Sequence, residues 1–156
     1  MDEDNLFPDD IDDLDYEDFS EEEEEETIGY KTSALFDYES GEFIFNGSGQ
    51  IIDADGITAW QQWCENVIAT ERYKHDSYTD DIGIDYDEIF NLEDQEEIES
   101  MLEAEISEAL ECDPYGRTQY VQNIDFEWIS TSEVIVRIDV VGMESELISI
   151  EATIAA

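Results

Sequence analysis

Three runs near the end of the chain alternate apolar and polar residues with a period of two. Because successive side chains of a β-strand point to opposite faces, each run predicts a strand with one buried face. The linkers between the runs are short, which favours antiparallel neighbours joined in sequence order. We therefore expect a three-stranded antiparallel meander with one face against a core. Its inward positions are Ile124, Phe126 and Trp128 in the first run; Val134, Val136, Ile138 and Val140 in the second; and Ile148, Ile150, Ala152 and Ile154 in the third.

A first helix is predicted from residue 56 to about residue 71. Asp55 has a side chain that can cap its first turn, and Gly56 takes the first helical position. Apolar residues then recur at the helical spacing and form one face. The residues of that face are Ile57, Trp60, Cys64, Val67 and Ile68. Before this helix, we expect turns at residues 39–41 and 46–49, between short β-prone runs.

A second helix is predicted from residue 92 to residue 112, with Asn91 as its cap and with Pro114 and Gly116 ending it. The chain between the two helices is expected to be irregular and partly extended. The predicted fold class is α+β, an antiparallel β-meander covered by two amphipathic helices. The inward face of the second helix is expected to hold Ile98, Met101, Leu102, Ile106, Ala109 and Leu110.

Residues 1–26 differ from the rest in composition. They hold 16 of the 46 acidic residues, include no Lys or Arg, and end in a run of six Glu. Like charges at this density resist compaction, so we expect an acidic tail that is disordered when alone. Apolar side chains scattered among the acids favour ordering on a partner. Residues 27–156 are expected to form a single α+β domain.

The charge of the chain restricts its partners. The formal net charge is −41, from 46 Asp and Glu against five Lys and Arg, yet 41% of the residues are hydrophobic and can supply a core. So acidic a surface repels nucleic acid and anionic membranes, and it favours a cationic partner or a saline medium. We therefore expect neither a nucleic-acid nor a membrane partner. The longest uncharged run, residues 43–52, is too short to cross a bilayer, and no signal-peptide pattern begins the chain, which indicates a soluble protein made in the cytosol.

No pattern indicates a catalytic, cofactor or metal site. Cys64 and Cys112 are far apart, so a zinc site is not expected; a disulfide stays open, and Cys64 reads as a small buried hydrophobe. An EF-hand beginning at Asp76 fails because Asp81 stands where its glycine belongs. A glycosidase needs only two carboxylates, and none of the 46 can be singled out, so a small acidic hydrolase stays an alternative. We expect no enzyme activity and no cofactor.

The scarce positive groups gather at Arg72, Lys74 and His75, within the stretch TERYKHD. A histidine beside an arginine suggests a catalytic group, but no Cys or Ser nucleophile pattern accompanies it. We interpret His75 as an exposed or salt-bridged side chain. Arg72 and Lys74 follow the predicted first helix, where cations complement the C-terminal dipole. In so acidic a chain, we also expect the arginines to be held in specific carboxylate pairs.

The run GEFIFNGSGQIIDADGITAWQQWCENVIATERYKHDSYTDDIGIDYDEIF resembles the sheath-initiator, or inner baseplate wedge, family of contractile phage tails, in particular its XkdS-like members. In that family a short strand leads through an Asp–Gly pair into a helix that ends in Thr-Glu-Arg-Tyr, and a glycine and a second helix follow. The matching positions here are Asp55, Gly56, Thr70, Glu71, Arg72, Tyr73 and Gly83. A short acidic–Pro–Arg element often comes next, and Asp113, Pro114 and Arg117 hold its place, with Tyr115 and Gly116 inserted. The likeness covers roughly residues 35–154.

This resemblance implies a structural protein of the virion tail baseplate, assembled in the host cytoplasm. Six copies would surround the tail tube and join the wedge to the first sheath ring, with wedge, sheath, and tube or hub proteins as partners. The implied wedge contact comprises Glu71, Arg72, Tyr73, Asp113, Pro114 and Arg117. The terminal strand, residues 145–154, is the natural edge for addition of a sheath strand, since an unpaired edge offers free N–H and C=O groups. The expected positions on that edge are Ser145, Leu147, Ser149, Glu151 and Thr153.

A protein that mimics DNA is the main alternative. Its carboxylates would imitate phosphates and occupy a DNA-binding enzyme, as in an anti-restriction protein. The net charge of −41 agrees with this interpretation. The concentration of acids in one flexible tail, rather than along rigid helices at phosphate spacing, disagrees with it, and so does the TERY stretch.

Overall fold

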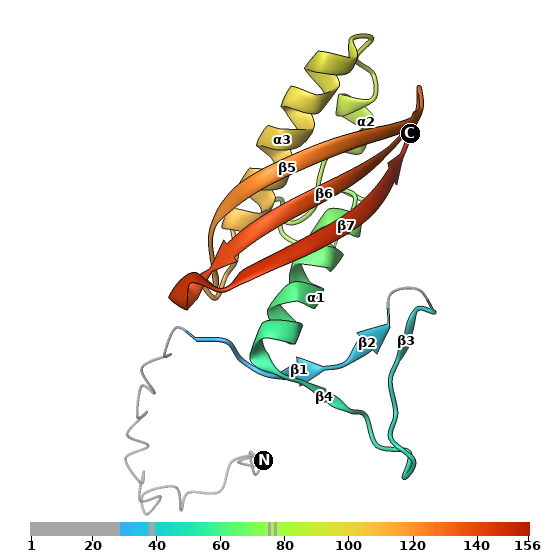
Figure 1. The fold of residues 1–156 in the computed structure, drawn as a ribbon. Helices are drawn as coiled ribbons and strands as arrows, with labels where there is room; N and C mark the ends of the chain where they lie inside the picture. The colour runs from blue at the N-terminus through green and yellow to red at the C-terminus, as the bar shows by residue number, and fades with distance from the viewer. Residues whose placement is uncertain (1–28, 38–39, 75, 77) are drawn as a thin grey trace, which may run out of the picture.

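The computed structural model describes residues 29–37, 40–74, 76 and 78–156 (Figure 1). The predicted acidic tail, the predicted start of the domain at residue 27, and His75 lie outside the described residues. The chain forms an α+β fold, as predicted. In order, its elements are β1 (Ser33–Ala34), β2 (Phe36–Asp37), β3 (Glu42–Phe43), β4 (Asp53–Ala54), α1 (Gly56–Ala69), α2 (Tyr86–Ile89), α3 (Gln95–Glu111), β5 (Thr118–Ser130), β6 (Glu133–Gly142), the 3-10 turn η1 (Met143–Ser145) and β7 (Leu147–Ala155).

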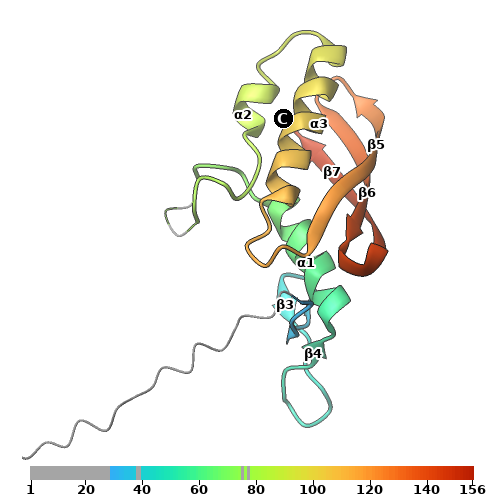
Figure 2. The same cartoon turned by 90° about the vertical axis from the view of Figure 1, so that its left-hand side faces the viewer.

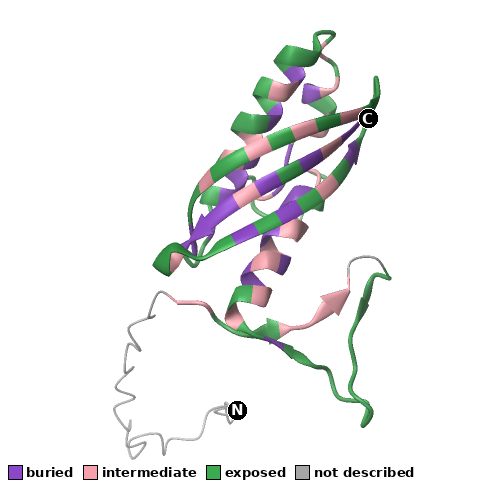
Figure 3. Ribbon diagram, viewed as in Figure 1, coloured by how far each residue is buried: buried purple, intermediate pink, exposed green. Residues whose placement is uncertain are grey.

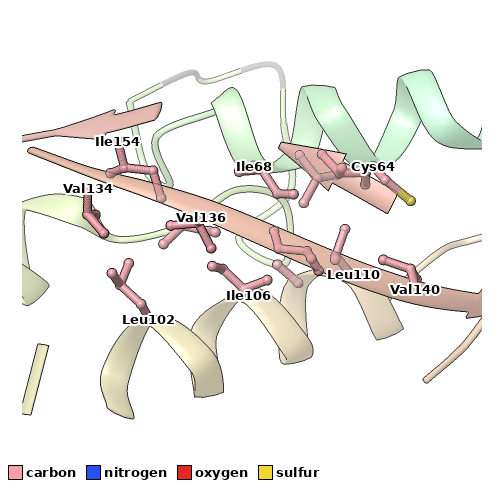
Figure 4. Close-up of a cluster of buried hydrophobic side chains, with 14 of the residues drawn as sticks. Cys64, Ile68, Leu102, Ile106, Leu110, Val134, Val136, Val140 and Ile154 are labelled. Carbon is pink, nitrogen blue, oxygen red and sulfur yellow. The ribbon is translucent and has the colours of Figure 1, made fainter. Parts of the chain in front are cut away.

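The predicted meander is confirmed. Strands β5, β6 and β7 pair antiparallel in that order, with β6 in the centre. Helices α1 and α3 cover one face of this sheet (Figures 1 and 2). Buried and exposed residues alternate along the strands, so the opposite face is turned to solvent (Figure 3). Figure 4 shows the core between the layers, where Leu102 and Ile106 of α3 face Val136 of β6.

Helix α1 begins where the sequence predicts. The Asp55 carboxylate accepts a hydrogen bond from the Thr58 N–H at 2.8 Å, which caps the first turn. The helix ends at Ala69, two residues earlier than predicted. Ile57 was predicted to face the core but is 37% exposed. Figure 1 shows that the first turn of α1 extends past the end of the meander.

The predicted second helix is present as α3, Gln95–Glu111, and it begins three residues later than predicted. The short α2 occupies a stretch predicted to be irregular, and α3 starts at Gln95 with Asp94, not Asn91, as its cap. Asn91 instead donates from its side-chain amide to the carbonyl of Asp87, a residue of α2. Met101 was predicted to face inward but is 36% exposed, because it lies at the margin of the buried stripe. The other five predicted inward residues of α3 are buried, namely Ile98, Leu102, Ile106, Ala109 and Leu110.

Residues 33–37 and 40–54 form an arm beside the start of α1 (Figures 1 and 2). Strand β1 pairs with β4, and β2 with β3, and the turn expected at residues 46–49 is present. Gln62 of α1 ties the arm to the helix: its side chain accepts from the Phe36 N–H at 2.8 Å and donates to the Ala34 carbonyl at 3.3 Å. The arm nevertheless exposes several large apolar side chains, Phe43, Ile44, Phe45, Ile51 and Ile52.

Candidate assembly surfaces

The segment after α3 folds into a turn around one ion pair, which we call the 113–117 turn. Arg117 donates through Nε to Asp113 Oδ2 at 2.8 Å and through Nη2 to Oδ1 at 2.9 Å. The same carboxylate accepts from the backbone N–H groups of Tyr115 and Arg117. Both charged side chains are buried. The fork of a guanidinium matches a carboxylate in this two-bond geometry, so the buried charges are fully compensated.

Aromatic rings enclose the Arg117 guanidinium. Its central carbon lies 5.4 Å from the centre of the Trp63 ring and 5.1 Å from that of Tyr115, within cation–π range. The Lys31 ammonium lies 4.8 Å from the Tyr115 ring centre as well. Tyr115 was treated as an insertion in the sequence, yet it packs directly on the arginine. The exposed tip of the turn consists of Pro114, Tyr115 and Gly116.

The TERY stretch belongs to a second structure, which we call the 70–84 loop. The Arg72 N–H donates to the Ile84 carbonyl and the Ile84 N–H donates to the Thr70 carbonyl, so the two ends of the loop are bonded together. Gly83 has a φ of +92°, and a Cβ there would lie 2.7 Å from the Thr70 carbonyl oxygen. Only glycine therefore fits at position 83, where the loop passes close to the Thr70 carbonyl, without strain.

The Arg72 side chain is buried and turned toward α3. It donates through Nε to the Gly83 carbonyl at 3.0 Å, and its Nη1 lies 3.3 Å from Glu105 Oε2. That distance suffices for an ion pair, but the two atoms do not form a hydrogen bond. Arg72 Nη2 and Glu105 Oε2 are both buried without a hydrogen-bond partner. The predicted pairing of arginines with carboxylates is confirmed. The predicted placement of cations over the end of the first helix is wrong, since α1 has no basic residue in its last turn.

The exposed part of this loop carries Tyr73 and a small ion-pair network. Tyr73 is 67% exposed and has a φ of +66°, a conformation unusual for a residue other than glycine. The Lys74 Nζ atom lies 2.9 Å from Glu71 Oε1 and 3.1 Å from Asp87 Oδ2. Hydrogen bonding to the Glu71 carboxylate is the main cause that raises the pKa of Lys74.

The six residues expected at the wedge contact belong to two structures, the 113–117 turn and the 70–84 loop. Arg117 pairs with Asp113 and lies beside Trp63, whereas Arg72 lies against Gly83 and Glu105. Asp113, Arg117 and Arg72 use their charges within the domain. The exposed members of the expected set are Tyr73 and Pro114.

The two edges of the sheet differ in regularity. Strand β5 has three register shifts along its pairing with β6, whereas β7 pairs with β6 through nine consecutive residue pairs. Bulges bend a strand and interrupt its hydrogen-bonding pattern, so a regular edge is the better template for a further strand. Among the described residues, no strand pairs with the outer side of β7.

Hydrogen bonds at both ends of the β6–β7 hairpin identify the groups of β7 that face outward. The Gly142 N–H donates to the Glu146 carbonyl, and the Ala156 N–H donates to the Ser132 carbonyl. In an antiparallel pair, residues that exchange both bonds alternate with residues that exchange none. The register between these ends is continuous, so the even-numbered residues of β7 bond to β6. The N–H and C=O groups directed away from β6 are those of Leu147, Ser149, Glu151, Thr153 and Ala155.

Four of the five residues expected on this edge, Leu147, Ser149, Glu151 and Thr153, therefore have outward backbone groups. Their side chains lie on the solvent face of the sheet. On this face, Arg137 of β6 forms ion pairs with both neighbouring strands: its Nε lies 2.7 Å from Glu151 Oε2 of β7, and its Nη1 lies 2.8 Å from Glu127 Oε2 of β5. Ser145 was predicted to be part of the strand but lies in η1 with a φ of +64°. Ser145 is part of the turn that follows β6, so β7 begins only at Leu147.

A groove of about 440 Å³ runs between the outer side of β7 and the last turns of α1. We call it the β7 groove. Ile68 and the β7 residues from Ile150 to Ala155 line it, together with the carboxylates of Glu65, Glu71 and Glu151. Tyr86 completes its wall, and its hydroxyl donates to the Ile68 carbonyl at 2.5 Å. Burial raises the pKa of the Tyr86 hydroxyl. The wall is thus anchored to the end of α1.

Sequence reasoning missed several residues of these surfaces. Trp63 and Tyr115 enclose Arg117, Gln62 holds the arm, and Glu65 borders the groove. Gln62 carried a detectable signal, because a polar residue lies beside the apolar face of the predicted helix. Nothing in the sequence distinguishes Glu65 from the other 45 acidic residues. Cys64 and Cys112 are both free, and Cys64 is buried as expected.

In the described part of the chain, no helix is long and apolar enough to cross a membrane. No group of three His, Cys, Asp or Glu side chains there is arranged to hold a metal ion. No curated protein matches the chain. Residues 32–145 match the sequence model of a family described as the contractile injection system sheath initiator. This range spans the arm, α1, α2, α3, β5 and β6. The chain therefore belongs to the contractile injection system sheath initiator family.

Proposed function

We propose that this protein joins the baseplate wedge to the first sheath ring of a contractile tail and starts sheath assembly by accepting a strand on β7. Membership of the family supplies the structural role in a contractile injection system. The observation that carries the finer proposal is the regular outer edge of β7, with its outward N–H and C=O groups beside an open groove. Such an edge is completed by a strand from another chain.

Regular pairing favours β7 over the other edge. An added strand needs a series of correctly spaced donors and acceptors, and β7 offers them from Leu147 to Ala155. On β5, the three register shifts would break such a series. The sheath strand would thus become the fourth strand of the sheet, next to β7. Each protein copy would present one such edge, and six copies around the tube would present a ring of them.

The wedge contact is proposed at the exposed tip of the 113–117 turn and at Tyr73. The Asp113–Arg117 pair would act as a rigid support that holds Pro114 and Tyr115 at the surface. Arg72 would play the same part for the 70–84 loop, which presents Tyr73. Partners would be wedge, sheath, and tube or hub proteins. A role without catalysis follows from this assignment, and family membership favours it over both a DNA mimic and an acidic hydrolase.

Hydrogen exchange tests strand addition on the unmodified protein. On mixing with the sheath protein of the same particle, we expect slower exchange at the outward amides of Leu147, Ser149, Glu151 and Thr153. The amides of Ile148 and Ile150 already bond to β6 and should change little. Equal exchange of the outward amides with and without sheath protein contradicts the proposal.

A backbone variant offers a second test. Thr153→Pro removes one outward N–H without removing a bond to β6, so it should slow sheath polymerisation in electron micrographs. Thr153→Val keeps the N–H and serves as the matched control. Circular dichroism and melting show whether the proline variant is folded. A folded proline variant that starts sheaths as fast as the control refutes strand addition at this end of β7.

A further inference from the structure

The β7 groove has a charge pattern that the edge alone does not explain. Glu65, Glu71 and Glu151 line it, and no Lys or Arg is among the described residues that do so. Between the carboxylates lies an apolar floor that includes Ile68, Ile150 and Ile154. A strand paired with β7 would turn every second side chain toward this floor, because side chains alternate between the two faces of a sheet.

The three carboxylates differ in their existing partners. Glu71 is paired with Lys74 at 2.9 Å, and Glu151 with Arg137 at 2.7 Å. Glu65 receives a hydrogen bond from the Gln61 side chain at 2.9 Å, and no cationic group in the described residues pairs with it. It is half-buried on α1, at the side of the groove opposite β7. Glu65 is therefore the carboxylate in this groove that is left for a partner.

We infer that the segment accepted by β7 is an extended strand with a Lys or Arg on its helix-facing side, and that this cation pairs with Glu65. The inference rests on the proposed function and specifies the chemistry of its partner. The aliphatic stem of such a side chain would lie over Ile68, and its charged end would reach the groove margin. A partly enclosed ion pair of this kind is stronger than one in open solvent.

The pairing also selects the alignment of the incoming strand. Backbone hydrogen bonds alone allow a strand to slip by two residues and keep the same face inward. One cation opposite Glu65 distinguishes the correct alignment from the slipped ones. An acidic residue at the same place would lie beside a carboxylate and be rejected. The net charge of −41 attracts cationic segments to the whole protein surface. An ion pair with Glu65 would fix where along β7 such a segment binds.

Charge reversal at Glu65 tests the inference in the full-length protein with the sheath protein of the same particle. Glu65→Lys should weaken binding by about tenfold at low salt, and Glu65→Gln by a smaller factor. The difference between wild type and Glu65→Lys should shrink as salt is raised, because ions screen the pair. The matched control is Glu103→Lys, which makes the same charge change on the exposed side of α3, the helix that packs against β5.

Exchange of the outward β7 amides separates this inference from the proposed function. If sheath protein protects these amides in wild type and equally in Glu65→Lys, with equal affinity, strand addition stands and the cation preference is refuted. If no protection occurs even in wild type, strand addition itself fails. If Glu103→Lys weakens binding as much as Glu65→Lys, the effect is one of net charge, and the assignment to Glu65 is overturned.

Discussion

The 113–117 turn and the 70–84 loop each bury an arginine, but they satisfy it to different degrees. In the turn, Arg117 meets both oxygens of Asp113 and lies within cation–π range of two aromatic rings. In the loop, Arg72 makes one hydrogen bond to Gly83 and approaches Glu105 without aligned geometry. Burial of a charge is offset only when attraction and hydrogen bonds replace its lost hydration. The turn meets this condition more fully than the loop.

This difference has a consequence for local stability. A segment with fully compensated buried charges resists opening, whereas one with unpaired polar atoms opens at lower cost. We therefore expect the turn to remain closed under conditions in which the loop already opens. The two proposed wedge contacts would then differ in kind: a rigid tip at Pro114 and Tyr115, and an adjustable one at Tyr73.

The largest effect is expected for Arg117→Ala. Removing the guanidinium leaves the Asp113 carboxylate buried without its partner and opens the space between Trp63 and Tyr115. The free energy of unfolding should fall by about 3–5 kcal/mol. Urea unfolding followed by circular dichroism measures it. Arg117→Lys is the control for charge, and it should recover only part of the loss because ammonium lacks the two-bond fork. An unfolding midpoint equal to wild type for the alanine variant contradicts the assignment.

A smaller loss is expected for Arg72→Ala, about 1–3 kcal/mol, because the pair that it breaks is incompletely bonded. The double variant Arg72→Met with Glu105→Leu sharpens the comparison. It removes both charges and fills the space with apolar side chains, so it should be more stable than Arg72→Ala. Thermal and urea unfolding of both variants give the answer. If Arg72→Ala costs as much as Arg117→Ala, the two sites do not differ as described.

Alkaline pH should weaken the region beneath the turn by a moderate amount. Burial raises the pKa of the Cys64 thiol to about 12, and the nearby Asp113 carboxylate contributes to the shift. A raised pKa means that the folded state holds its proton more tightly than the unfolded state. Stability is therefore fully present below about pH 9 and declines as pH rises toward 12. Melting curves from pH 8 to 11 should fall more steeply for wild type than for Cys64→Ala. Parallel curves would show that the thiol does not contribute.

The smallest effect is expected for Arg137→Ala. Its two carboxylate partners, Glu127 and Glu151, lie with it on the exposed face of the sheet. Solvent and salt screen exposed pairs, so the melting temperature should change little. The same measurement at low and high salt detects any remaining contribution. A loss comparable to that of Arg72→Ala would mean that exposure does not govern the ranking of the three arginines.

Much of the fold could be predicted because its signals are local. Alternation identified all three strands of the meander, and helical spacing identified the buried faces of α1 and α3. The errors lie at the ends of elements, where the outcome depends on tertiary contacts. Asn91 and Asp94 are both good caps, and the presence of α2 decided between them. Ile57 has the right spacing for the buried face, but its side chain is partly exposed.

The candidate surfaces were less predictable for a physical reason. The pairing of arginines with carboxylates could be predicted because positive groups are scarce in this chain. The partner of each arginine could not, because it depends on distances across the fold, such as that from Arg72 to Glu105. The aromatic enclosure of Arg117 by Trp63 joins segments far apart in the chain. Glu65 becomes distinctive only when its neighbours Glu71 and Glu151 are seen to have cations already.

The backbone orientation of β7 bears on how such proteins diverge. A contact made by N–H and C=O groups depends little on side-chain identity, provided that apolar and polar residues still alternate. Substitutions at Leu147, Ser149 and Thr153 should therefore be compatible with the proposed strand addition as long as this alternation is kept. The family match ends at residue 145, two residues before β7 begins. If β7 accepts a strand as proposed, relatives could differ in sequence at this strand and still make the same backbone contact.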